Sequence, residues 1–169
     1  MKEGVILIRT AGIVPESFSD GPGIRFVVFA QGCRHQCPGC HNPHAHSFEG
    51  GTLMEVENIL SLLEQNPLLD GVTFSGGDPF EQANAFGELA EKARARGYNV
   101  MTYTGWRYEE LLEISDSKQM RLLKATDILM DGRFELTLKS ELLPFRGSSN
   151  QRMIDVPRSL EENQVCCIA

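Results

Sequence analysis

The strongest constraint in this sequence is a short loop that carries three cysteines directly after an apolar, strand-like segment. Cys33, Cys37 and Cys40 lie within eight residues and follow the apolar stretch 24–30. Spacings of three and two residues let one loop turn all three sulfurs toward a common point, and thiolates favour iron–sulfur clusters, zinc or copper(I). Three thiolates on a four-iron cluster would leave one iron free to bind a substrate, much as catalytic zinc keeps an open position. The loop is therefore a predicted metal site.

The cysteines alone leave other interpretations open. A structural zinc site needs a fourth ligand, which a nearby histidine could supply: His35, His41, His44 or His46. The string 37–41 has the C-x-x-C-H pattern of haem attachment, and Cys37 with Cys40 could form a redox dithiol. Neither of these two explains Cys33, and the apolar run 5–8 is too short for a secretory signal, which haem attachment outside the cytoplasm requires.

Hydrophobic periodicity predicts strands that alternate with helices. The expected strands span residues 24–30, 72–74, 99–104 and 127–131. The expected helices are one opened by a capping-box pattern at 52–55, one from about residue 80 to Gly97, and a broken one over 111–114 and 120–123. This succession predicts an α/β fold with a parallel sheet and right-handed crossovers. With about four to six strands, the sheet is expected to curve into a partial, open parallel β/α barrel rather than close into eight units.

The distinctive motifs all follow the carboxyl ends of these strands. The cysteine loop follows the first strand, residues 76–79 the second, 104–105 the third and 131–133 the fourth. Parallel α/β folds place their ligands at this edge of the sheet. Gly76 and Gly77 have no side chains and would allow a ligand to approach the backbone closely, although an ordinary strand-to-helix turn is an equal alternative.

These motifs together resemble the radical S-adenosylmethionine (SAM) enzymes, whose signature C-x-x-x-C-x-x-C is filled here by the three cysteines of the loop. Segments 20–26, 41–43 and 75–79 are similar to the glycyl-radical-enzyme activases. The Cys-Pro-Gly-Cys filling and the segment 145–152 look most like the branch of that family that activates anaerobic ribonucleoside-triphosphate reductases. The resemblance covers about residues 10–156, nearly the whole length of one domain.

The resemblance implies a barrel of the radical SAM type with one 4Fe–4S cluster on Cys33, Cys37 and Cys40. It also implies a set of residues that bind SAM: Gly39, Cys40, His41, Gly76, Gly77, Asp78, Asp131 and Arg133. Within this set, the glycine pair would receive the methionine part of SAM, and Asp131 with Arg133 would act toward its carboxylate. No catalytic side chain is expected beyond the cluster and SAM, because the cofactor performs the chemistry.

The implied activity is the reductive cleavage of SAM, followed by hydrogen abstraction from a glycine of a partner. The implied partner is the large subunit of an anaerobic ribonucleoside-triphosphate reductase, with a reduced flavodoxin- or ferredoxin-like electron donor. Residues 20–23 are a candidate contact with the incoming glycine loop, or else a simple turn. One alternative is an activase of pyruvate formate-lyase or a related lyase. Another, of a different class, is a non-catalytic binding module stabilised by zinc.

Composition sets the remaining expectations. A chain of 169 residues, 41% of them hydrophobic, is expected to form a single domain over 1–169. A net charge of −7 without a basic block indicates no nucleic-acid partner, and no apolar run approaches the roughly 20 residues that span a bilayer. Five cysteines without a disulfide framework predict a cytoplasmic location. Residues 157–169 are expected to be a flexible tail, in which the formal C-a-a-X match at Cys166 is accidental because no polybasic segment precedes it.

Overall fold

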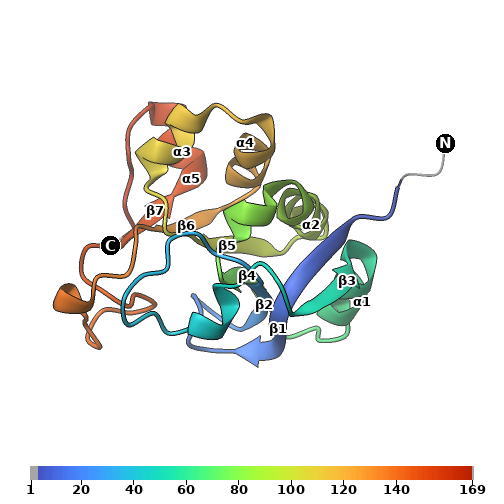
Figure 1. Cartoon of the computed structure of the whole chain (residues 1–169). Helices are drawn as coiled ribbons and strands as arrows, with labels where there is room; N and C mark the ends of the chain where they lie inside the picture. Colours follow the sequence, from blue (N-terminus) through green and yellow to red (C-terminus); the bar gives the residue numbers. More distant parts are fainter. Residues whose placement is uncertain (1–3, 169) are drawn as a thin grey trace.

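Four parallel strands form the centre of the fold. The computed structural model describes residues 4–168, and within them β2, β4, β5 and β6 pair in parallel, in the order of the chain. Their bounds are Arg25–Ala30, Gly71–Gly76, Asn99–Tyr103 and Ile128–Asp131. Each coincides with one of the four segments expected from the sequence, so the parallel core of the expected α/β fold is confirmed (Figure 1).

Three further strands extend this core in antiparallel orientation. They are β1 (Leu7–Ser17), β3 (Thr52–Glu55) and β7 (Arg152–Asp155), and the resulting seven-stranded sheet has the order β3-β1-β2-β4-β5-β6-β7. The sheet is therefore larger than expected. Register shifts interrupt the pairing of β1 with β2, and most of β3 is exposed. Neither strand has the continuous apolar run that marks a buried parallel strand in a sequence.

The expectation of a capping box at residues 52–55 is wrong. These residues form β3, which pairs with residues 7–10 of β1. Helix α1 (Val56–Glu64) begins directly after the strand, and Glu55 precedes it in an extended conformation without a side-chain cap. Backbone pairing along a whole strand outweighs one local capping pattern, which contributes only about 1 kcal/mol.

The helices of the described chain pack into one core cluster on one face of the sheet. Besides α1 they are α2 (Ala83–Ala95), α3 (Tyr108–Ile114), α4 (Ser117–Lys124) and α5 (Val156–Glu162). Phe26, Val72 and Phe74 are the strand residues at the centre of this core, and Phe74 meets Phe86 of α2 edge to face. Within residues 4–168, no helix has the length and apolar character needed to cross a bilayer.

This one-sided arrangement follows from the strand order. Right-handed crossovers that move across the sheet in one direction place every connecting helix on the same face, whereas a doubly wound sheet has helices on both. The sheet ends at β3 and β7 without closing, so the winding is that of an open β/α barrel. The opposite, inner face has only a small cluster of Met101, Met130 and Met153, and this leaves room there for a site.

The structure corrects the expectation of a flexible tail after residue 156. Helix α5 occupies the first part of this segment, and Cys167 pairs with Ile154 of β7 as an isolated bridge. Ser159 is fully buried; its hydroxyl donates to the carbonyl of Asp155 and accepts the backbone N–H of Cys166. These contacts return the chain to the sheet. They were not predicted because the residues that make them do not form an apolar run.

Removal of residues 157–169 should therefore destabilise the protein. Loss of α5 exposes part of the core, which we expect to cost about 2 to 4 kcal/mol and to lower the unfolding temperature by roughly 5 to 15 °C. Thermal unfolding followed by circular dichroism measures this change. The matched control is Cys167→Ala at an exposed position, which should alter stability by less than about 0.5 kcal/mol. An unchanged unfolding temperature in the truncated chain would restore the flexible-tail expectation.

Candidate functional site

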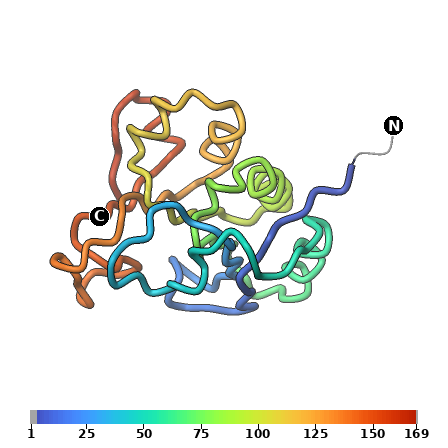
Figure 2. Tube along the Cα trace, in the orientation of Figure 1, coloured from blue at the N-terminus to red at the C-terminus, as the bar shows by residue number. Residues whose placement is uncertain are grey.

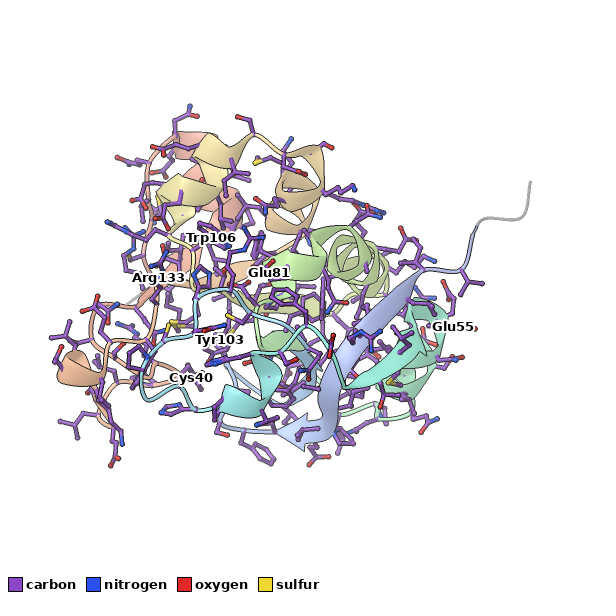
Figure 3. The ribbon with its side chains drawn as sticks, in the orientation of Figure 1. Cys40, Glu55, Glu81, Tyr103, Trp106 and Arg133 are labelled. Carbon is purple, nitrogen blue, oxygen red and sulfur yellow. The ribbon has the colours of Figure 1, made fainter. Side chains whose placement is uncertain are left out.

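The candidate site is a cavity of about 500 Å³ at the carboxyl ends of the parallel strands. Its volume lies within the range of roughly 300 to 1,000 Å³ that is typical of small-molecule sites. Three thiols, the glycine pair and the segment after β6 meet there, and its lining includes Asp20, Cys33, Cys37, Cys40, His41, Gly76, Gly77, Tyr103, Thr104, Phe145 and Arg146. Figure 3 labels two of these residues, Cys40 and Tyr103. The cavity thus gathers motifs that lie more than 100 residues apart in the sequence.

The cysteine loop turns so that all three thiols reach this cavity. Cys33 is buried at the end of β2, and its N–H donates to the carbonyl of His46. Gln36 and Gly39 take left-handed backbone conformations, with φ of 49° and 74°, and these turns fold the loop back on itself. Cys37 and Cys40 are half-buried. All three cysteines line the cavity, and their binding of a cluster stays a prediction.

The thiols suit an iron–sulfur cluster in their chemistry. Burial raises the pKa of Cys33 to about 11, and it also raises the pKa of Cys37. Both are therefore protonated at neutral pH until a metal binds, and cluster assembly must displace these protons. Among residues 4–168, no three His, Cys, Asp or Glu side chains converge on a point that could hold a single ion. A four-iron cluster would accept each thiolate at a different iron.

Gly76 and Gly77 lie against the root of the cysteine loop. A Cβ on Gly77 would overlap the carbonyl oxygen of Gly32, and one on Gly76 would overlap the backbone of Ala30. Gly76 also has a φ of 93°, which favours glycine. Both glycines line the cavity. The close packing of these glycines against the neighbouring backbone is therefore reason enough for glycine at both positions. The binding of SAM by these two residues stays a prediction.

Asp78 has a role that differs from the expected one. It is fully buried and does not occur among the described residues that line the cavity. Its carboxylate accepts hydrogen bonds from the hydroxyl of Thr104 at 2.9 and 3.1 Å, from the N–H of Gly105 at 2.9 Å and from the N–H of Phe80 at 3.0 Å. Nε2 of His35 lies 3.1 Å from Oδ2 of the same carboxylate. Asp78 therefore joins three loops, and its expected contact with SAM stays a prediction.

His35 extends this network toward the surface. Its ring meets the ring of Trp106 edge to face, with centroids 4.9 Å apart. Arg34 lies over the same indole at 5.7 Å and makes a bidentate ion pair with Glu81. Figure 3 labels both Trp106 and Glu81 in this region. No local pattern predicts these contacts, because each partner comes from another loop; the one hint is that His35 lies between two cysteines of the loop, Cys33 and Cys37.

Asp131 and Arg133 also differ from expectation. Both lie in a neighbouring groove and are absent from the described lining of the main cavity. Asp131 is buried and accepts hydrogen bonds from the guanidinium of Arg152 at 3.0 and 2.5 Å, and from the N–H of Tyr108 at 2.8 Å. Its charge is thereby neutralised within the protein. Gly39, the fourth expected contact outside the described lining of the cavity, turns the loop beneath Leu136.

The segment between β6 and β7, residues 132–151, closes one side of the cavity, and we call it the strap. Phe134, Phe145, Arg146 and Gly147 of the strap line the cavity. Leu136 of the strap also lies over Gly39 of the cysteine loop, and Figure 2 shows the two segments side by side. The sequence motif 145–152 indicated a family but not that its first residues face the site. Only the pairing of β7 with β6 brings them there.

Several known proteins are similar to this chain over most of its length. Residues 19–154 match the family described as a 4Fe-4S single cluster domain. The anaerobic ribonucleoside-triphosphate reductase-activating protein of Enterobacteria phage T4 is 33% identical over 147 residues, which are 83% of this chain and 90% of the relative. The proteins of the same name from Escherichia coli K12 and Haemophilus influenzae are 34% and 33% identical over 145 residues, 81% of this chain and 92% and 91% of theirs. A crystal structure of QueE from Escherichia coli has a TM-score of 0.49 at 12% identity, over 74% of this chain and 70% of that one.

The chain belongs to the family of anaerobic ribonucleoside-triphosphate reductase-activating proteins. Its expected membership of the radical SAM activating enzymes, with a domain of the 4Fe–4S type, is confirmed. The alternative of a non-catalytic module stabilised by zinc is contradicted by the family match. The family match extends from the loop before β2 into β7. It therefore includes every element that lines the cavity.

Each of the three loop cysteines should be necessary for the cluster. After anaerobic reconstitution, the wild-type protein should bind about four irons with broad visible absorption, because each thiolate holds a different iron. Cys33→Ala, Cys37→Ala and Cys40→Ala should each prevent this, as iron analysis and absorption spectra would show. Cys166→Ala and Cys167→Ala are the controls and should keep the iron. Stoichiometric zinc without iron in anaerobically purified protein would refute the assignment.

Loss of the Asp78 carboxylate should destabilise the metal-free protein. Asp78→Ala leaves the hydroxyl of Thr104 and two buried N–H groups without an acceptor, which we expect to cost about 3 kcal/mol or more. Urea unfolding measures this difference. Glu55→Ala is the control, because Glu55 is exposed and lies at the far end of the sheet from the site (Figure 3); its effect should stay below about 0.5 kcal/mol. Equal stabilities of the two variants would remove the proposed role of Asp78.

Proposed function

We propose that this protein activates an anaerobic ribonucleoside-triphosphate reductase in the cytoplasm by generating a glycyl radical on the large subunit of that enzyme. The observation that carries the proposal is the meeting of three loop thiols with Gly76 and Gly77 in one cavity at the carboxyl ends of the parallel strands. Identity of 33% to 34% with reductase-activating proteins over most of both chains supports this partner over a lyase.

The residues present fit one 4Fe–4S cluster and SAM. Cys33, Cys37 and Cys40 would hold three irons of the cluster, and the two remaining described cysteines, Cys166 and Cys167, lie at β7 and α5 instead of at the cavity. When bound and reduced by a flavodoxin- or ferredoxin-like donor, the cluster supplies the electron that cleaves SAM into methionine and a 5′-deoxyadenosyl radical, which takes a hydrogen atom from the partner's glycine. The chain itself provides binding groups, orientation and exclusion of water.

Each part of the cavity has a distinct task in this proposal. The backbone at Gly76 and Gly77 would receive the methionine part of SAM, and His41, exposed beside Cys40, would lie toward the adenine. The strap would cover the cofactor from the side. The cavity reaches the surface near Ser19, which is exposed and lines it together with Asp20. The partner's glycine loop would enter there, and its burial would keep water from the radical.

Incubation with reductant, SAM and the large subunit of the anaerobic ribonucleotide reductase of the same organism should produce a glycyl radical. The expected result is a doublet in electron paramagnetic resonance, followed by reduction of ribonucleotides. Cys37→Ala protein is the matched control and should give no doublet, because it lacks a cluster ligand. A doublet that forms only with pyruvate formate-lyase as partner would keep the chemistry and refute the named target.

A further inference from the structure

Arg146 stands out among the residues that line the cavity. It is the only Arg or Lys in the described lining, and no carboxylate of the described chain lies within ion-pair distance of its guanidinium. Its Nε atom is buried and has no hydrogen-bond partner. The guanidinium therefore stands at the cavity as a cation without a counter-charge from the described chain. A charged group at a cavity without an internal partner is suited to bind a ligand of opposite charge.

The backbone around Arg146 is fixed on both sides. The hydroxyl of Tyr103 donates to the carbonyl of Phe145 at 2.6 Å, and the side chain of Gln151 accepts the N–H groups of Gly147 and Ser148 at 2.9 and 3.2 Å. Phe145 has a φ of 64°, a left-handed conformation that is unfavourable for a residue with a side chain. The strap thus accepts strain at Phe145 and sets the position of Arg146 before any ligand binds.

The charges of SAM restrict what Arg146 can bind. SAM carries a cationic sulfonium, a cationic ammonium group and a single anionic group, the carboxylate of its methionine part. A guanidinium without an internal ion-pair partner matches a carboxylate in charge and in its planar, forked geometry. Arg133 cannot compete for this role, because it lies in the neighbouring groove and not in the cavity lining.

We propose that Arg146 binds the carboxylate of SAM and fixes the methionine part in the cavity. This inference rests on the proposed function and names a contact that the function alone does not assign. Arg146 acts as a binding residue that neutralises the carboxylate. Asp20 is the only Asp or Glu in the described lining and supplies the negative charge of the cavity. SAM would therefore bind in one orientation, with its anionic group at the strap.

Anaerobic calorimetry on the reconstituted proteins tests this contact with two probes, SAM and decarboxylated SAM. Arg146→Gln should weaken the binding of SAM by about 10-fold or more, since hydrogen bonds to charged groups are the strong ones. Its affinity for decarboxylated SAM should stay within about 2-fold of wild type, because that analogue has no carboxylate to lose. The affinity of Arg146→Lys for SAM should lie between those of wild type and Arg146→Gln, because lysine keeps the positive charge but lacks the forked geometry of the guanidinium.

Arg133→Gln is the matched control and should bind SAM within about 2-fold of wild type. If Arg146→Gln lost affinity for SAM and for decarboxylated SAM to the same extent, the role of Arg146 would be merely structural and the inference would be overturned. A loss of SAM binding in Arg133→Gln as large as that in Arg146→Gln would overturn it as well. If the wild-type protein bound no SAM, the proposed function would fail; if it bound SAM and Arg146→Gln bound it equally well, only this inference would fail.

Discussion

The site depends on one buried carboxylate. Asp78 accepts hydrogen bonds from its own loop, at Phe80, and from the loop after β5, at Thr104 and Gly105. Through His35 it also contacts the cysteine loop, two residues beyond the first thiol. Hydrogen bonds to a charged group are strong inside a protein, where the effective dielectric constant is low. Three loops that begin at three different strands are therefore fixed relative to one another before any cofactor is present.

The winding of the sheet explains why the loops have a cavity to share. Because the crossovers place the helices on one face, the inner face is covered only by loops and the strap. At its amino-terminal end this face is closed by Arg25, which is buried and donates hydrogen bonds to the side chains of Thr73 and Asn99 and to three backbone carbonyls. Burial lowers the pKa of Arg25 to about 10, so it remains charged at neutral pH. The carboxyl-terminal end is left open for a ligand.

The sequence identified those parts of the fold that have a strong local signal. The four parallel strands are apolar runs because both of their faces are buried, and the three cysteines combine a specific spacing with a specific chemistry. The strands β1 and β3 were missed because their exposed residues are partly polar and their pairing partners are distant. Helix α5 was missed because its contacts with the core depend on Ser159 and Cys166, residues that give no apolar periodicity.

Long-range partners account for the contacts within the site that the sequence did not predict. Asp78 follows the glycine pair directly, so its position in the chain suggested a contact with the cofactor, but the side chain points to Thr104, Gly105 and His35. No local pattern distinguishes a carboxylate that binds a ligand from one that joins loops. The same holds for Asp131, whose partner Arg152 lies 21 residues further along the chain.

Two arginines at the strap have opposite environments: one makes ion pairs within the described chain and the other makes none there. Arg152 makes ion pairs with Asp131 and Glu109, and its guanidinium lowers the pKa of Glu109 to about 2. Asp131 precedes the strap and Arg152 follows it, so this ion pair joins the two ends of the segment, and the cross-strand pairing of the same two residues reinforces it. Arg146 lies between these ends without an internal partner. A segment whose ends are tied together by one arginine can therefore present another in a fixed position. The buried carboxylate of Asp131 contributes to this by anchoring the strap.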